Sequence, residues 1–435
     1  MAEPALSQLL AANGLFSSGS AFDSLPQELN FPQLSRSEPD AIVPTLLEYA
    51  SAVRASDLYL YTNEKDIEFC VRHLGIVRTL GSVPVEIGRR CLLFVKTMST
   101  MNTSDRRKPL EGRWLFTRKS GDPLDLRVST IPTLHGEDST IRILDQARAI
   151  LSIDQLGMHP HKFAQFGQLL SSPSGLILVT GPTESGKTTS LYAGLSYLNS
   201  GTRKINTIEE PIEYSLKGIR QSQASSQNGN GTGDATFDVL LRGVLRQAPD
   251  VIMIGEIREE ETAQIAVRAA ATGHLVLSTL HAPVAAAAVH SLLRLGIPPR
   301  ALSHALLGIV SQRLVRTLCA SCKQFYSFPM ARAFESVRRW LDPETEIRLF
   351  GPLGCPACFM SGFAGRTGLF EVLMVTPAVR HLLEEAAPVT AIRQLAVREG
   401  MMEFRHAALL KVASGVTSLE EFTRVLPAEF MAAAD

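Results

Sequence analysis

Alternation of apolar and polar residues divides the chain into two α/β regions. In the first, residues 57–61 and 124–129 alternate with the period of two that predicts strands with one buried face, and residues 44–50 have helical spacing. In the second, apolar strands that end in polar residues alternate with helical segments, which predicts a parallel, doubly wound sheet. Its strands are predicted at 175–180, 205–211, 251–256 and 275–279.

These patterns and the segments between them predict three regions. Residues 1–40 are rich in Ser, Pro, Ala and Asn, and we expect a mobile extension or a docking peptide. Residues 41–148 form the smaller mixed α/β domain, and residues 149–435 form the domain with the parallel sheet. This second domain begins with a connector at 152–158, and a polar loop at 228–233 is expected to be exposed.

The charge balance excludes little but gives one indication. The 435 residues contain 43 basic and 43 acidic side chains, so the formal charge is zero. Motors that work on nucleic acid normally carry a basic excess, and we therefore expect no nucleic-acid partner. The first basic residue is Arg36, so the cationic flank of a signal peptide is missing, and the apolar run at 171–181 is far shorter than the roughly 20 residues that span a bilayer. We expect a cytoplasmic protein that reaches a membrane only through partners.

The loop after the first predicted strand of the second domain has the pattern G-x-x-x-x-G-K-[ST], between a strand and a helix. Its glycines let backbone N–H groups curl around phosphate oxygens, and the helix start adds partial positive charge there. Lys187 is placed to reach the β- and γ-phosphates of ATP, and the Thr188 hydroxyl to ligate Mg²⁺. The alternative is a glycine-rich turn with a chance lysine. The residues predicted to contact the nucleotide are Gly181, Pro182, Thr183, Glu184, Ser185, Gly186, Lys187, Thr188 and Thr189.

Polar side chains lie at the ends of the other predicted strands. Glu209 and Glu210 end one strand, Glu256 ends another, and His274 and His281 bracket a third. Ligands of such sheets bind at the carboxyl ends of the strands, where a carboxylate can hold the metal's water or orient an attacking water. The alternative is that the two adjacent glutamates are a solvated strand end and that the histidines only satisfy hydrogen bonds.

Four of the six cysteines form two C-x₂-C pairs, Cys319 with Cys322 and Cys355 with Cys358. Two such pairs in a cytoplasmic chain are the ligand set of a tetrahedral Zn²⁺ site, because each pair offers two thiolates on one tight turn. Disulfides are the alternative, which a reducing compartment disfavours. Four thiolates leave no open coordination position, so the predicted role is structural. Cys70 and Cys91 have no such spacing and are predicted to be core residues.

The motifs occur in an order that resembles the ATPases of type II secretion and of type IV pilus assembly, over residues 55–427. The blocks that carry the resemblance are the phosphate-loop (Walker A) block 181–192, the acidic box 207–214, the Walker B block 245–258, the histidine box 272–281, and the segments 365–371 and 415–421. The resemblance implies a RecA-like P-loop NTPase domain, a smaller PAS-like N-terminal domain, and a zinc module at 316–370 followed by C-terminal helices.

The same resemblance implies roles for single residues. Lys187 and Thr188 would hold phosphate and Mg²⁺, Glu256 would polarise the attacking water, Glu209 and Glu210 would support the metal site, and His274 and His281 would sense or position the γ-phosphate. Two N-terminal blocks, 125–130 and 140–144, match those whose arginines reach the nucleotide, which makes Arg127 and Arg142 candidates. For these two, the alternative is a surface arginine on a strand, and Arg242 and Arg246 are weaker candidates.

The chain departs from the family pattern at several positions. Glu184 stands where the phosphate loop usually has glycine, which predicts slow turnover or altered nucleotide affinity unless the carboxylate points outward. Glu210 replaces the usual aspartate of the acidic box, and Leu74 replaces an aspartate that the family usually has before the glycine at position 75. Ala282 and Pro283 follow His281 where polar residues are common.

What the resemblance implies overall is a homohexameric motor with ATP at subunit boundaries. Hydrolysis would move the N-terminal domain about the 145–160 connector and so drive an inner-membrane platform protein of a pilus or secretion machinery. The four cysteines are typical of the assembly and export branch. Two alternatives are open: a conjugative (type IV secretion) or pilus-retraction ATPase of the same superfamily, and a nucleotide-gated assembly scaffold with little turnover.

Overall fold

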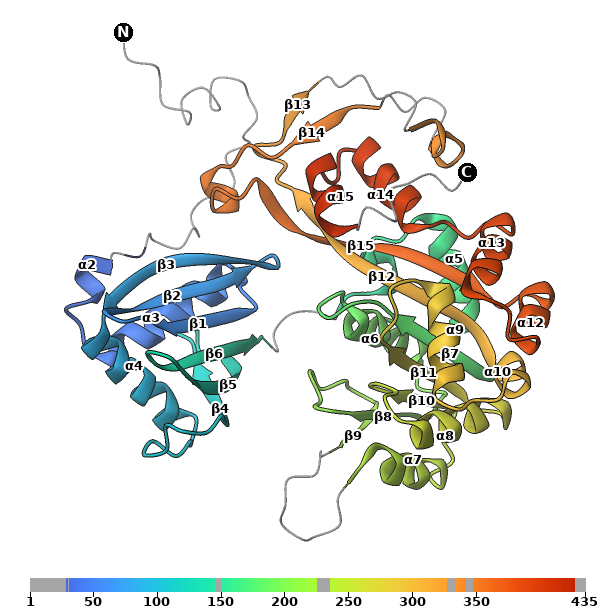
Figure 1. The fold of residues 1–435 in the computed structure, drawn as a ribbon, viewed down its shortest axis with the longest axis horizontal. Coiled ribbons are helices and arrows are strands. Elements are labelled where there is room, and N and C mark those ends of the chain that lie inside the picture. Colours follow the sequence, from blue (N-terminus) through green and yellow to red (C-terminus); the bar gives the residue numbers. More distant parts are fainter. Residues whose placement is uncertain are drawn as a thin grey trace. The chain divides into compact units, whose positions relative to one another are not determined.

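The computed structural model describes residue 29 and residues 31–145, 150–224, 235–326, 334–341 and 347–426. The chain divides into two compact units (Figure 1). The first contains the described residues before 149 together with 319–324 and 352–365, and the second contains the rest. The expected loop at 228–233 and most of the expected extension at 1–40 lie outside the described residues.

The first unit is built on a six-stranded antiparallel sheet with the strand order β3-β2-β1-β6-β5-β4. Its strands confirm the two predicted from alternation at 57–61 and 124–129. They are β1 (Asp57–Thr62), β2 (Asp66–His73), β3 (Ile76–Pro84), β4 (Leu110–Thr117), β5 (Pro123–Thr133) and β6 (Gly136–Leu144).

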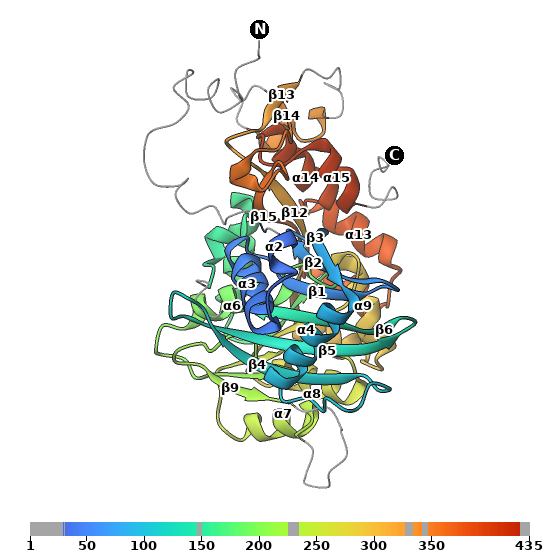
Figure 2. The same cartoon turned by 90° about the vertical axis from the view of Figure 1, so that its left-hand side faces the viewer.

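Helices cover one face of this sheet, and Figure 2 looks onto that helical side. They are α2 (Phe31–Leu34), α3 (Pro39–Ala52) and α4 (Val85–Met98). Because strand side chains alternate between faces, Leu58 and Leu60 of β1 pack into the core against α3 and α4. Cys91 lies in this core, and Cys70 is also buried, as their sequence context predicted.

The second unit is built on a seven-stranded sheet with the order β15-β12-β7-β11-β10-β8-β9, in which the pairs from β12 to β9 are parallel. Alternate residues of β7 belong to two different cores, Leu176 and Leu178 to one and Ile177 and Val179 to the other. A strand that is covered on both faces is apolar at nearly every position, and residues 175–180, predicted as an apolar strand, have this pattern. The strands are β7 (Gly175–Thr180), β8 (Ile205–Glu209), β9 (Arg220–Gln223), β10 (Val251–Ile254), β11 (Leu275–Leu280), β12 (Leu306–Leu318) and β15 (Phe363–Met374).

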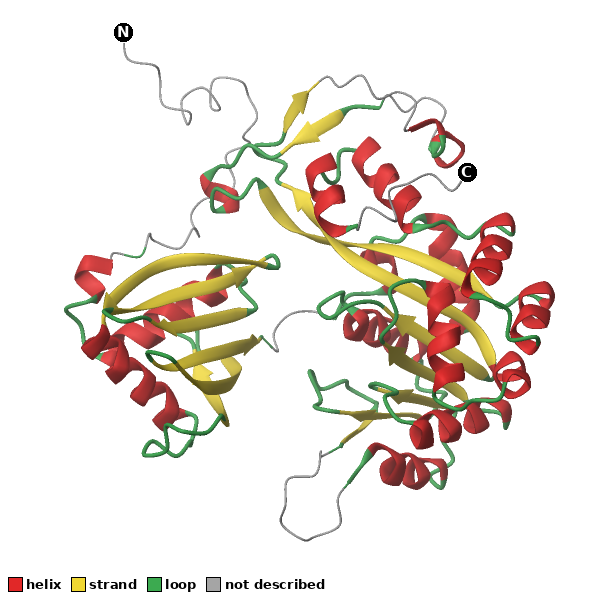
Figure 3. Ribbon diagram, viewed as in Figure 1, coloured by secondary structure: helices red, strands yellow, loops and turns green. Residues whose placement is uncertain are grey.

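Two sets of helices enclose the second sheet (Figure 3). One core contains residues of η1 (Ile153–Leu156), α5 (Pro160–Leu170) and α6 (Lys187–Leu198). The other contains residues of α7 (Phe237–Leu245), α8 (Glu260–Ala271), α9 (Ala285–Arg294), α10 (Pro299–Ala305), α12 (Pro377–Glu384) and α13 (Val389–Arg398). The expected doubly wound, mainly parallel sheet is therefore confirmed.

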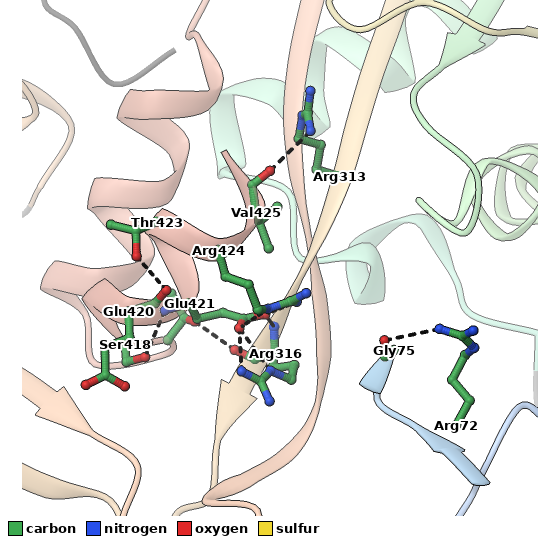
Figure 4. Close-up of polar contacts among 11 residues, drawn as sticks. Arg72, Gly75, Arg313, Arg316, Ser418, Glu420, Glu421, Thr423, Arg424 and Val425 are labelled. Atoms are coloured by element: carbon green, nitrogen blue, oxygen red, sulfur yellow. Dashed lines mark hydrogen bonds and ion pairs between the residues drawn. The ribbon is translucent and has the colours of Figure 1, made fainter. Parts of the chain in front are cut away.

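The C-terminal helices form a further core with the end of β12. They are α14 (Phe404–Ala413) and α15 (Leu419–Val425), and the short elements nearby are β13 (Gln324–Tyr326), η2 (Arg338–Trp340), β14 (Leu349–Gly351) and η3 (Pro356–Cys358). In Figure 4, the fully buried Glu421 of α15 accepts hydrogen bonds from Arg316 of β12 and from Arg424. Arg316 thus fastens α15 to the strand, whereas Arg424 lies on α15 itself and pairs with Glu421 within the helix.

The cysteine-bearing turns, at 319–324 and 352–365, belong to the first compact unit. The reason is a set of contacts at Phe359, whose ring packs against the N-terminal core and edge-on to His73 at 5.8 Å. Arg78 Nη1 also donates to the Phe359 carbonyl at 3.0 Å. Among the described residues, no helix is both long and apolar enough to cross a membrane.

Candidate nucleotide site

The turn between β7 and α6 has the backbone that its glycines predicted. Gly181 and Gly186 have φ angles of +148° and +87°, in the region that favours glycine. A Cβ on Gly181 would lie 2.3 Å from the Gln312 carbonyl oxygen, so only glycine fits there. Lys187 begins α6, and its Nζ donates to the carbonyls of Gly181 at 3.0 Å and Pro182 at 2.9 Å. The loop therefore curls tightly round its own lysine.

Glu184, which replaces the usual glycine, also has a left-handed backbone, with φ of +60°. This region costs a non-glycine residue roughly 1–2 kcal/mol. The side chain is exposed and lines the pocket described next. The substitution thus adds both local strain and a negative charge beside the loop.

A pocket of 330 Å³ lies where the phosphate loop meets the carboxyl ends of β8, β10 and β11. This is the edge at which ligands of parallel sheets bind. Burial lowers the pKa of Lys187, and the nearby Glu256 opposes that effect. The pocket is lined by Thr183, Glu184, Lys187, Thr188, Leu191, Glu209, Glu210, Pro211, Glu213, Phe237, Met253, Gly255, Glu256, Arg258, Thr279 and His281.

Glu256 is held from both sides. Its Oε2 lies 2.7 Å from Arg258 Nη2, and its Oε1 lies 2.9 Å from His281 Nε2. The carboxylate is only 18% exposed, and it lines the same pocket as the lysine of the phosphate loop. Such an acceptor, with its orientation fixed, can accept a proton from or orient a water beside a phosphate.

Glu209 and Glu210 are adjacent in sequence but lie in different surroundings. Glu209 is 3% exposed and accepts hydrogen bonds from Tyr192 Oη, Thr207 Oγ1 at 2.5 Å and Gln221 Nε2 at 3.1 Å. Burial, together with the hydrogen bond to this carboxylate, raises the pKa of Tyr192. Glu210 is exposed and lines the pocket. The Glu209 carboxylate is thus held in one orientation by hydrogen bonds, whereas the Glu210 carboxylate is exposed at the pocket.

Three residues of the site were not predicted from sequence. Gln312 of β12 is 1% exposed, and its Nε2 donates to the Ser185 carbonyl at 2.6 Å, which steadies the phosphate loop. Arg258 ends the Walker B block, two positions beyond Glu256, so its position at the end of the strand could have indicated a place in the site. Tyr192 ends the recognised Walker A block, but nothing in that block indicates its contact with Glu209.

Several predicted residues lie elsewhere. His274 precedes β11, at the amino end of the strand, where its Nδ1 is 3.0 Å from the Ala269 carbonyl oxygen. His281 follows the same strand, so the two histidines lie at opposite edges of the sheet and only His281 lines the pocket. Arg242 pairs with Glu261 at 2.6 Å, and Arg246 is an exposed residue at the end of α7.

Arg127 and Arg142 face each other on β5 and β6 of the first unit. Arg142 also pairs with Asp57 on β1, and its Nε lies 3.4 Å from Asp57 Oδ1. The Asp57 side chain is only 4% exposed and also lies 3.5 Å from Arg72 Nε. A buried carboxylate therefore orients Arg142, whose own side chain is 53% exposed.

The four cysteines of the two C-x₂-C pairs come together. Their sulfur atoms all lie within 4.8 Å of one another. The Sγ–Sγ distances are 3.9 Å for Cys319–Cys355, 3.8 Å for Cys322–Cys358 and 3.7 Å for Cys355–Cys358. A tetrahedral ion with Zn–S bonds of about 2.3 Å requires sulfurs roughly 3.8 Å apart, so this donor set fits zinc in both chemistry and spacing.

A parallel sheet, a phosphate loop at its carboxyl edge and an oriented carboxylate facing that loop define a P-loop nucleotide-binding protein. A family model described as Type II/IV secretion system protein matches residues 37–424. The chain belongs to this family.

Relatives and solved structures agree with this assignment. The Type II secretion system ATPase E of Vibrio cholerae is 42% identical over 413 residues, which cover 93% of this chain and 79% of that protein. The Type IV pilus assembly ATPase PilB of Acinetobacter baylyi is 39% identical over 381 residues, 87% of this chain and 65% of that protein. The crystal structure of the pilus retraction motor PilT with bound ADP is similar with a TM-score of 0.59 and 26% identity, over 88% of this chain and 97% of that one.

Proposed function

We propose that this protein hydrolyses ATP and that the hydrolysis powers type IV pilus assembly or type II protein secretion. The observation that carries the proposal is the fixed position of Glu256, which lines the pocket together with Lys187 and is held by Arg258 and His281. Relatives about 40% identical over most of the chain have names that describe ATPases of these two machineries.

Each side chain has a role that its position supports. Lys187 neutralises the β- and γ-phosphates, and the exposed Thr188 hydroxyl at the first turn of α6 would hold Mg²⁺, which supplies charge neutralisation when bound. Glu256 orients the attacking water and accepts its proton, while His281 keeps the carboxylate turned toward the phosphates. Glu210 would hold water around the metal, and Glu209 keeps the end of β8 in shape.

The larger assembly is also a proposal. The protein acts as a homohexamer, peripheral to the inner membrane on its cytoplasmic side, with an inner-membrane platform protein as its partner. Arg127 and Arg142 of the first unit would engage the nucleotide, and their release after cleavage would move the two units against each other. The buried Asp57 orients Arg142, and this supports a role of the arginine in binding the nucleotide rather than as a plain surface residue.

The cysteine cluster supports a structural zinc site held by Cys319, Cys322, Cys355 and Cys358. The backbone N–H groups of Cys355 and Gly362 donate to Cys358 Sγ at 3.2 and 3.1 Å. Such donors favour a thiolate, the form that binds metal. This cluster also favours assembly or export over the retraction and conjugative alternatives, which generally lack it.

The test is phosphate release by the purified, metal-replete protein with Mg-ATP. Glu256→Gln should lower kcat by a factor of about 10²–10⁴, the range for losing a general base. Glu259→Gln, the same change at an exposed position outside the pocket lining, should leave kcat unchanged. A wild type without turnover, even with its membrane partner supplied, together with no effect of Glu256→Gln, would instead support the scaffold function that Glu184 suggests.

A zinc measurement separates the branches of the family. A protein that is purified without zinc, or one that retains full activity as Cys355→Ser, would favour the retraction or conjugative class.

A further inference from the structure

The loop that carries His281 is fixed at its far end by a buried carboxylate. The loop, residues 281–284, leads from β11 into the first turn of α9. Thr180 Oγ1 donates to the Ala282 carbonyl at 3.0 Å in its middle. At its end, the backbone N–H of Ala285 donates to Glu371 Oε2 at 3.2 Å. The position of His281 therefore depends on the contacts that Thr180 and Glu371 make with the residues after it.

Glu371 comes from β15, far away in sequence, and is 3% exposed. Its second oxygen, Oε1, accepts from the backbone N–H of Phe404 at 3.1 Å, in the first turn of α14. Burial raises the pKa of this carboxyl to about 7, although the two N–H donors act in the opposite direction. Burying a carboxylate away from water costs free energy, and the N-termini of two helices stabilise its negative charge through their free N–H groups and dipoles.

No step assigned above to the nucleotide pocket uses Glu371, which does not line it. Its connection to the chemistry is through α9. The Ala285 N–H that it binds is four residues beyond His281, whose Nε2 lies 2.9 Å from the Glu256 carboxylate. Because only residues 282–284 lie between them, a shift of the first turn of α9 is passed on along this short loop to His281.

We propose that Glu371 is a positioning residue of the nucleotide site, which holds His281 against Glu256 by fixing the start of α9. The inference rests on the proposed ATPase function. The same carboxylate also binds the start of α14, so it joins the C-terminal helices to the loop that touches the catalytic glutamate.

The experiment is a double-mutant cycle on phosphate release by the full-length, metal-replete protein. Glu371→Gln keeps the volume of the side chain but offers only one acceptor oxygen for two N–H donors. It should lower kcat about tenfold with KM for ATP changed less than about twofold, because it misplaces a group that acts on the transition state. In a His281→Ala background, the same substitution should cause no further loss of kcat.

Glu421→Gln is the matched control, because Glu421 is also fully buried and accepts backbone and side-chain hydrogen bonds but does not touch the loop. It should leave kcat of the folded protein unchanged. If Glu371→Gln fails to fold, Ala285→Pro removes the donated N–H from the other side of the contact, at the first helical position, where proline is tolerated.

Two results would overturn the proposal: a Glu371→Gln protein with wild-type kcat, or an equal loss of kcat with and without His281. A merely structural role of Glu371 predicts the second result. If the wild type releases no phosphate and Glu256→Gln changes nothing, the proposed function itself fails, and this inference fails with it.

Discussion

The hydrogen bonds of Glu421 with Arg316 and Arg424 allow the effect of substituting these residues on stability to be predicted. Glu421 is 0% exposed, and its two oxygens accept from Arg316 Nε and Nη2 at 2.9 and 2.7 Å, from the Arg316 backbone N–H at 2.9 Å, and from Arg424 Nε and Nη2 at 2.7 and 2.6 Å. The Arg316 side chain is 13% exposed and that of Arg424 is 43% exposed. The two arginines are therefore not equivalent.

These exposures set the expected order of effects. Glu421→Ala leaves the buried Arg316 without this carboxylate and should lower the free energy of unfolding by about 3–5 kcal/mol. Glu421→Gln keeps one acceptor oxygen and the volume, and it should cost about 1–3 kcal/mol. Arg424→Ala removes a half-exposed partner, whose attraction is screened by water, and it should cost only about 0–1 kcal/mol.

The dependence on pH has a defined sign. Burial by itself would raise the pKa of Glu421, but the hydrogen bonds from Arg424 and Arg316 lower it below the usual value of 4.5. A carboxyl with a lowered pKa contributes stability above its unfolded pKa and loses that contribution as the pH falls through its folded pKa. The difference between wild type and Glu421→Gln should thus be constant near neutrality and shrink below pH 4.5.

The assay is hydrogen exchange of the backbone amides of α15 and the end of β12 in a urea series, since the chain has two compact units and need not unfold in one step. Glu420→Gln is the control, because it makes the same chemical change at the exposed neighbouring position. A cost of Glu421→Ala below about 1 kcal/mol, the level of a surface pair, or an equal cost of Arg424→Ala would contradict this order of effects.

Three other predictions concern the sites. Glu184→Gly should raise kcat/KM for ATP in a phosphate-release assay, because it removes a negative charge beside the triphosphate and relieves a left-handed backbone; an unchanged or lower value would contradict this. Tyr192→Phe should cost about 1–3 kcal/mol in urea unfolding, since it removes a donor from the buried Glu209, and a cost near zero would show that the donors Thr207 and Gln221 suffice. Zinc analysis of the purified protein should find one ion per chain and much less in Cys355→Ser, whereas an equal content in both would exclude the cluster as the site.

Much of the fold and site could be predicted from sequence, because the features involved are local. The strand at 175–180 is apolar throughout and is followed at once by the phosphate loop, so period, turn and chemistry indicate the same structure. The two cysteine pairs are short-range patterns, and only the distance between the pairs, 36 residues between Cys319 and Cys355, required the fold to bring them together.

Contacts between distant segments could not be predicted in this way. Gln312 reaches Ser185 over 127 residues, and Glu371 reaches Ala285 over 86, and both contacts depend on which strands are neighbours. His274 does not line the pocket for a different reason. His274 and His281 belong to one motif, but the six residues of β11 separate them, and at about 3.3 Å per residue a strand places its two ends roughly 20 Å apart.

Packing of the connector reduces the number of its residues that can act as a hinge. Residues 145–160 were expected to be the hinge, but η1 within them is folded, and its Ile153 and Leu156 are buried in the same core as α5 and α6. The Gly157 carbonyl accepts from Lys411 Nζ at 2.8 Å, and burial lowers the pKa of that lysine to about 8. A segment with buried apolar side chains and such an anchor moves with the second unit. In the proposed motion, residues 153–157 therefore move with the second unit, to which Lys411 anchors them.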